Sequence, residues 1–351
     1  MPETTTDLSA TATTTAGTAK DLDASLAQFK EKFEALRNEV ANVIVGQREI
    51  LDFTLIAMIA GGHVLLEGVP GLGKTMLVRS LASALHLRFQ RIQFTPDLMP
   101  ADVIGTNILV DEGHGHSKFQ FSQGPLFCNL LLADEINRAT PKTQSALLEA
   151  MQEKSVTVAG ETRILERPFF VLATQNPLEM EGTYPLPEAQ LDRFFFKLRV
   201  PYPSKAEFGE ILLRTTERKS PTVNPIFDGK DLVALGEFAR DVPMAPSIRE
   251  RVVDLIMSTH PEVTHASADV RKYVRYGASP RAGQACVLAA KIHAVLARRA
   301  HVSMEDVYAV ALPVLRHRVM LNFEAQADGM DTDKLISKII ETEGKNWAKA
   351  A

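Results

Sequence analysis

The chain has 351 residues, enough for two or three domains with ordinary hydrophobic cores. Hydrophobic residues make up 45% of it and charged residues 23%, which excludes collagen-like, coiled-coil and wholly disordered chains. The formal net charge of −4 provides no global basic field that would attract nucleic acid. The two cysteines, Cys128 and Cys286, cannot form a disulfide framework or a zinc site, and they favour a reducing compartment.

The N-terminal residues 1–20 are rich in Thr and Ala and lack the basic and apolar regions of a secretion signal. We predict a disordered tail there. The longest uncharged apolar stretch, residues 53–66, contains Gly61 and Gly62 and is shorter than the roughly 17 to 25 residues that span a bilayer. We therefore expect no membrane span and a cytoplasmic protein.

Hydrophobic periodicity predicts an α/β core over residues 21–202. Apolar residues at three- and four-residue steps indicate helices over residues 21–45 and 48–60. Apolar or β-branched runs predict strands over residues 63–67, 89–94, 129–133, 169–174 and 194–200, with helical patterns between several of them. Strands alternating with helices are typical of a largely parallel sheet covered on both faces.

Two segments interrupt this alternation, residues 107–123 and 154–167, and both are predicted to be inserted β-hairpins. The prolines at positions 201 and 203 end the last strand. Beyond them, apolar repeats indicate helices over residues 247–257, 281–298 and 303–315. We predict a second, helical lid domain over residues 203–351.

Residues 68–75, Gly-Val-Pro-Gly-Leu-Gly-Lys-Thr, match the phosphate-binding pattern GxxxxGK[ST] between a predicted strand and a predicted helix. The glycines let successive backbone N–H groups surround a phosphate, and the helix N-terminus adds partial positive charge. Lys74 would contact the β- and γ-phosphates and Thr75 would bind Mg²⁺. The alternative is a chance glycine-rich turn, which the flanking strand and helix disfavour.

A later apolar run, residues 130–133, is followed directly by two acids. This pattern is typical of a buried strand whose carboxyl end carries a metal-associated carboxylate. Asp134 would hold Mg²⁺ or its water, and Glu135 would polarise or deprotonate the attacking water. This pair favours hydrolysis over transfer to another acceptor. The alternative is a surface turn with two solvated acids.

Three further residues are candidates for contact with phosphate. Asn176 follows the next strand, where an uncharged amide could bind the γ-phosphate or orient the water, although Asn-Pro also commonly starts a turn. Arg193 precedes an aromatic strand. Arg281 lies in a first helical turn, where the helix dipole disfavours a cation and so suggests an anionic partner. A surface ion pair is the alternative for both arginines.

Taken in order, these motifs resemble those of the MoxR family of AAA+ ATPases, over about residues 45–321. The resemblance implies a P-loop αβα core with a helical lid, with the two hairpins as the helix-2 and pre-sensor-1 inserts. It implies Walker A at Lys74 and Thr75, Walker B at Asp134 and Glu135, sensor 1 at Asn176, an arginine finger at Arg193 and sensor 2 at Arg281. The nucleotide-binding residues it implies are Val45, Gly46, Gln47, Gly68, Pro70, Gly71, Leu72, Gly73, Lys74, Thr75 and Met76.

The resemblance also implies ATP and Mg²⁺ as cofactors and a homo-hexameric ring. Members of this family resemble chaperones, which remodel a protein client, help it to mature or load a cofactor into it. A separately encoded von Willebrand factor A-type protein is one candidate for that client. Whether Arg281 serves its own nucleotide or that of the next subunit stays open, as does the role of Arg138.

Other functions stay open from the residues alone. A nucleotide-dependent binding switch with slow turnover would share the same motifs. A nucleic-acid translocase would need a basic pore hairpin, yet residues 107–123 contain one lysine and two acids. The basic residues Arg271, Lys272 and Arg275, beside two tyrosines, could contact a nucleic acid or form a solvated helix face. A phosphoryl transferase is disfavoured because no acceptor site is recognisable.

Overall fold

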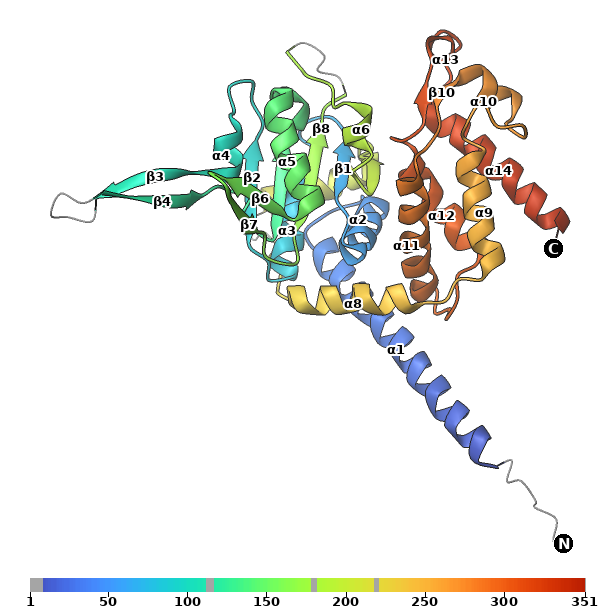
Figure 1. Cartoon of the computed structure of the whole chain (residues 1–351). Coiled ribbons are helices and arrows are strands. Elements are labelled where there is room, and N and C mark those ends of the chain that lie inside the picture. Colours follow the sequence, from blue (N-terminus) through green and yellow to red (C-terminus); the bar gives the residue numbers. More distant parts are fainter. Residues whose placement is uncertain (1–8, 112–116, 178–181, 218–220, 351) are drawn as a thin grey trace, which may run out of the picture.

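The structure, a computed structural model, describes residues 9–111, 117–177, 182–217 and 221–350. Its centre is a five-stranded sheet in the order β2-β5-β8-β1-β9, in which all neighbouring strands are parallel (Figure 1). The strands are β1 (Val64–Glu67), β2 (Phe89–Gln93), β5 (Leu130–Asp134), β8 (Phe170–Gln175) and β9 (Phe196–Arg199). The predicted parallel sheet is confirmed, with strands close to their predicted positions.

Both faces of the sheet are covered, because successive residues of a strand point to opposite sides. Leu66 and Leu132 join a hydrophobic cluster with α1, α2 and α3. Leu65 and Leu131 join a second cluster with α5. These helices are α1 (Ser9–Ala41), α2 (Arg48–Ala60), α3 (Lys74–Ala84) and α5 (Pro141–Glu153). The layers are therefore helix, sheet and helix, as the alternation of elements predicts.

The first helix begins earlier than its apolar periodicity predicts. Because α1 starts at Ser9, residues 9–20, which we expected to be disordered, are helical in the structure. Residues 1–8 lie outside the described part of the chain. Extending an existing helix avoids the cost of nucleation, and the alanines of this segment favour the helical state.

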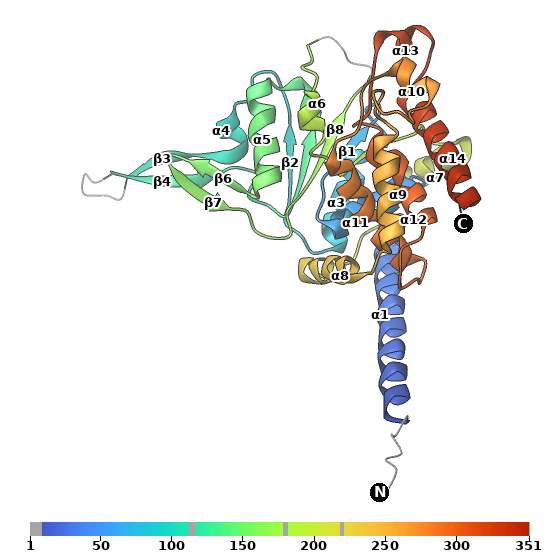
Figure 2. The same ribbon diagram turned by 45° about the vertical axis from the view of Figure 1, so that its right-hand side comes forward.

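Both predicted hairpins are present. β3 (Gly105–Asp111) pairs antiparallel with β4 (Ser117–Gln123), and β6 (Ser155–Val158) pairs with β7 (Glu161–Ile164). The short helix α4 (Pro100–Ile104) leads into the first hairpin. Both hairpins project from the side of the core that faces away from the lid (Figures 1 and 2). The tip of the longer hairpin, residues 112–116, lies outside the described residues.

The chain after β9 is mainly helical, and α11 lies at the centre of the lid. α11 packs against α9 and α12 within the lid and against α1 and α2 of the core. The helices are α7 (Lys205–Thr216), α8 (Gly229–Asp241), α9 (Pro246–Met257), α10 (Ala268–Tyr273), α11 (Pro280–Leu296), α12 (Met304–Leu315), α13 (Phe323–Ala327) and α14 (Thr332–Ala350). Buried residues of the lid and the core form one continuous hydrophobic cluster.

The predicted helical lid is confirmed, and it also contains one short pair of strands. β10 (Val274–Tyr276) pairs antiparallel with β11 (Met320–Leu321). Strands this short have no periodicity of their own and form only because the two segments meet in space. Within the described residues, no helix is long and apolar enough to cross a membrane.

Candidate active site

The phosphate-binding loop joins the carboxyl end of β1 to the amino end of α3, as the pattern requires. Gly71 and Gly73 have φ of 84° and 76°, the left-handed region that glycine adopts without strain. Gly73 is the N-cap of α3. A Cβ on Gly68 would lie 3.0 Å from the Cβ of Val200, so close packing also favours glycine there. The backbone geometry suits a loop whose amides face an anion.

Lys74 is the first residue of α3 and is only 9% exposed. Its ammonium donates hydrogen bonds to the backbone oxygens of Gly68 and Val69, at 2.5 and 3.1 Å. Burial lowers the pKa of Lys74, and the negative charges of Asp134 and Glu135 oppose this shift. The lysine and the two acids therefore lie within electrostatic reach of each other.

The carboxylate of Asp134 is held from two neighbouring strands. Arg91, on β2, forms an ion pair with it at 2.7 Å, and the hydroxyl of Thr174, on β8, donates to it at 2.6 Å. The same hydroxyl oxygen accepts the backbone N–H of Glu135 at 2.8 Å. Thr174 is therefore the residue that fixes both acids at the edge of the sheet. Sequence reasoning missed Arg91 and Thr174, because their roles depend on which strands are neighbours.

Glu135 has φ of 55°, which is uncommon for a residue with a side chain. Its carboxylate accepts from Gln93 at 2.7 Å and from Arg138 at 3.3 Å. The backbone turn directs the chain into the 3-10 helix η1 (Ile136–Arg138). Arg138, whose role the sequence left open, thus forms an ion pair with Glu135.

Asn176 follows β8, which lies between β5 and β1 in the sheet. This order places the asparagine at the same edge as the two acids and the phosphate-binding loop, and it is 6% exposed. Gln47 donates to the backbone oxygen of Leu72 at 2.8 Å and so contacts the loop, while the expected nucleotide-binding role of residues 45–47 stays a prediction. Of the other predicted residues, Pro70 and Met76 are exposed.

The residues at this edge fit a magnesium ion bound mainly through phosphate and water. Mg²⁺ usually has one or two protein ligands in nucleotide sites and keeps several waters. Thr75, at the start of α3, and Asp134 supply that chemistry. Among the described residues there is no cluster of three or more His, Cys, Asp or Glu that could hold an ion without a nucleotide.

The two candidate arginines lie at the opposite edge of the sheet. Arg193 follows α6 (Glu188–Leu191) and precedes β9, whose first residue pairs with Val64 at the amino end of β1. The phosphate-binding loop follows the carboxyl end of that strand, about 10 Å away at about 3.3 Å per residue. Arg281 and Arg193 both line a cavity of about 220 Å³ at the amino edge. Neither arginine therefore lies beside the phosphate-binding loop of its own chain.

Arg281 has weak partners within the chain. Its guanidinium is 3.6 Å from the carboxylate of Asp192 and 3.5 Å from the amide oxygen of Gln152. Its side chain is 47% exposed. The surface ion pair considered from the sequence is present, but these long contacts leave much of the guanidinium accessible.

The lid's basic cluster does not form one helix face. α10 ends at Tyr273, so Arg275 lies in β10. Lys272 forms ion pairs with Asp328 at 2.8 Å and Glu324 at 3.5 Å, and Arg271 donates to a backbone oxygen. The charge of Lys272 is thus matched locally, which weakens the positive field that a nucleic acid would meet there.

Two family models match the chain: the ATPase family associated with various cellular activities (AAA) at residues 63–196, and the AAA lid domain at residues 266–339. The uncharacterized protein YeaC of Bacillus subtilis is 45% identical over 86% of this chain and 91% of its own length. Chaperone MoxR1 of Mycobacterium tuberculosis is 43% identical over 87% of this chain and 80% of its own length.

The solved structure of a candidate ATPase from Cytophaga hutchinsonii superposes with a TM-score of 0.84. It is 40% identical and covers 93% of this chain, which covers 97% of that one. Protein MoxR of Paracoccus denitrificans is 30% identical over 86% of this chain and 92% of its own length. With the parallel sheet, the phosphate-binding loop and the acids at its edge, these similarities show that the chain belongs to the MoxR family of AAA+ ATPases.

Proposed function

We propose that the chain hydrolyses ATP with Mg²⁺ and uses the cycle to remodel or mature a protein client. The observation that carries this proposal is the convergence of Lys74, Asp134 and Glu135 at one edge of the sheet. A buried ammonium facing two carboxylates suits a bound triphosphate with its metal. The chaperone named among the relatives supports the client role.

The roles of the residues follow from their positions. The backbone amides of the loop and Lys74 would bind the phosphates, while Thr75 and Asp134 would hold the magnesium ion, which neutralises charge on the phosphates. Glu135 would accept a proton from the attacking water, and Asn176 would orient that water. Gln93 and Arg138 hold the carboxylate of Glu135 in place until then.

Arg193 and Arg281 would act on the nucleotide of a neighbouring copy. Both lie at the amino edge of the sheet, away from their own phosphate-binding loop, and so favour a head-to-tail arrangement of subunits. A closed ring, with six copies as the family resemblance implies, would give every nucleotide a pair of arginines. A von Willebrand factor A-type client and a cytoplasmic location stay predictions.

The decisive experiment compares ATP binding with turnover. We expect Lys74→Ala to lose binding and Glu135→Gln to bind ATP without hydrolysing it. Arg193→Ala should bind with the parental affinity, while turnover falls by about 10³ or more, the contribution typical of an arginine finger. Arg79→Ala, an exposed arginine of α3, is the matched control and should keep full activity. Undiminished binding by Lys74→Ala, or parental turnover by Arg193→Ala, would contradict the proposal.

A further inference from the structure

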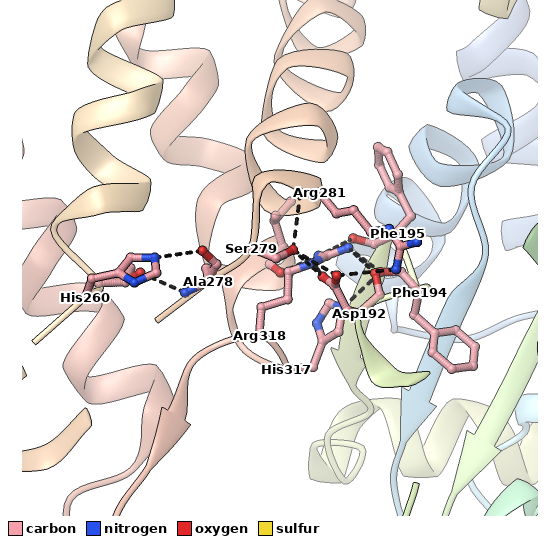
Figure 3. Close-up of polar contacts among 11 residues, drawn as sticks. Asp192, Phe194, Phe195, His260, Ala278, Ser279, Arg281, His317 and Arg318 are labelled. Carbon is pink, nitrogen blue, oxygen red and sulfur yellow. Dashed lines mark hydrogen bonds and ion pairs between the residues drawn. The ribbon is translucent and has the colours of Figure 1, made fainter. Parts of the chain in front are cut away.

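Arg318, in the lid, has a buried guanidinium whose side chain is only 3% exposed. Its Nε donates to the carboxylate of Asp192 at 2.8 Å, and its two terminal nitrogens donate to four backbone oxygens (Figure 3). These oxygens belong to Asp192, Phe194, Phe195 and Val314, at 3.1, 2.6, 3.2 and 2.6 Å. All five N–H groups of the arginine are therefore used.

Four of those five bonds reach the short segment of residues 192–195. That segment contains Arg193, so Arg318 fixes the backbone on both sides of the proposed arginine finger. The neighbouring His317 adds a contact of 2.9 Å from its ring nitrogen to the backbone oxygen of Phe194. A planar guanidinium with five donors holds a backbone in one geometry, which a single ammonium cannot do.

The carboxylate of Asp192 also controls the second arginine. It accepts the hydroxyl of Ser279, the N-cap of α11, with its two oxygens 2.9 and 2.8 Å away. Arg281 lies in the first turn of the same helix, 3.6 Å from that carboxylate (Figure 3). Arg318 approaches Asp192 more closely, at 2.8 Å, and offsets its negative charge. The positive charges of Arg193 and Arg281 are thereby left for an external anion.

We propose that Arg318 is a positioning residue that holds Arg193 and Arg281 together as one receptor for the terminal phosphate of a nucleotide bound to the neighbouring copy. The inference rests on the proposed function. Without Arg318, residues 192–195 lose their backbone restraint, and the unpaired carboxylate of Asp192 would draw Arg281 inward. The lid would then determine how strongly one subunit stimulates hydrolysis in the next, although its own nucleotide is bound normally.

The first test measures binding and turnover in Arg318→Lys, which keeps the charge without the five-donor geometry. We expect the parental ATP affinity and turnover reduced by about tenfold or more, since it acts through the arginine finger. Arg316→Lys is the matched control, because Arg316 also joins the lid to the core, by donating to the backbone oxygen of Lys197, and pairs with Asp333 of the lid without contacting residues 192–195. It should keep turnover close to the parental rate.

Rings that contain two different variants distinguish a positioning role of Arg318 from a general structural defect. Lys74→Ala subunits cannot bind ATP but carry an intact finger segment, so mixing them with Arg318→Lys should restore turnover at the nucleotides of the latter. Mixing Lys74→Ala with Glu135→Gln should restore none, because both changes disable the same nucleotide site. The double variant Arg318→Met with Asp192→Asn removes the charge pair together and should be restored in the same way.

The outcomes distinguish the inference from the function on which it rests. If Arg193→Ala mixed with Lys74→Ala regains no turnover, the trans role of the finger fails, which is the part of the proposed function on which the inference rests. If that mixture recovers while the Arg318 variants do not, Arg318 does not act through the finger. Parental turnover of Arg318→Lys by itself, or failure of every Arg318 variant to fold, would equally overturn the inference, since the residue would then be neutral or purely structural.

Discussion

His63 provides a test of the fold through its dependence on pH. It lies just before β1 and is 6% exposed. One ring nitrogen, Nε2, is 3.1 Å from the backbone oxygen of Met151 at the end of α5, and the other, Nδ1, accepts the backbone N–H of Val171 on β8 at 3.0 Å. Both bonds require a neutral ring, because a proton on Nδ1 would face the donor N–H of Val171.

These surroundings lower the pKa of His63 from 6.5 to about 4. Burial is the main cause, the bond to Met151 opposes it, and the charge of Lys154 lowers the pKa further. At about 1.4 kcal/mol per pKa unit, the difference in the pKa of His63 between the unfolded and folded chains corresponds to about 3 kcal/mol in the free energy of unfolding. The unfolded chain takes up a proton on His63 at a higher pH than the folded chain does. The stabilisation is therefore complete above pH 6.5 and is lost as the pH falls towards 4.

The assay is urea unfolding across this pH range, comparing the parental chain with His63→Gln. Glutamine can donate and accept the same two hydrogen bonds but does not titrate. Carboxylates elsewhere, and His317, whose pKa burial also lowers, contribute equally to both proteins and cancel in the difference. We expect the parental free energy of unfolding to fall by about 3 kcal/mol more than that of the variant. Parallel pH profiles would refute the reasoning.

Three further predictions concern single side chains. Thr174→Val should lower the free energy of unfolding by about 1 to 3 kcal/mol, because it leaves the N–H of Glu135 unpaired, and should reduce ATP turnover more than ATP affinity. Gly62→Ala should cost about 1 to 3 kcal/mol in urea unfolding, since its Cβ would lie 2.5 Å from the Cβ of Phe195. Asp306→Asn should cost about 3 to 5 kcal/mol in the same assay, because Asp306 is fully buried and pairs with Arg299. Burial would raise the pKa of Asp306, but hydrogen bonds from His293, Arg299 and Ser303 hold it at about 2. The ionised carboxylate therefore stabilises the folded chain fully above pH 3.8, and this contribution is lost as the pH falls towards 2.

Each of these predictions has a clear contrary result. Parental stability and turnover in Thr174→Val would mean that its hydroxyl does not hold the two acids. Gly209→Ala is the control for Gly62, because nothing lies within 4 Å of its added Cβ; equal effects of the two changes would contradict the packing argument. An Asp306→Asn chain as stable as the parent would show that its ion pair contributes nothing beyond its desolvation cost.

Much of the nucleotide half of the site could be predicted because its determinants are close together in the chain. The left-handed Gly71 and Gly73, the lysine and the helix that follows form one continuous segment. The buried strands before Asp134 and Asn176 are recognisable from short apolar runs, and parallel strands place their carboxyl ends at one edge. Local conformation and burial are therefore sufficient to predict the phosphate-binding loop and the strand ends beside it.

The other half depends on contacts between distant segments. Ser279 and Pro280 show locally that a helix begins, yet only the packing of α11 against the core places Arg281 in the same cavity as Arg193. Four of the five bonds of Arg318 likewise join residues more than a hundred positions apart. The partners of such buried arginines cannot be recognised from hydrophobic periodicity, because a charged side chain can be buried wherever the fold supplies hydrogen-bond acceptors. The direction in which the two arginines face is thus a property of the folded chain, whereas the capacity of its glycine-rich loop to surround a phosphate lies in the order of its residues.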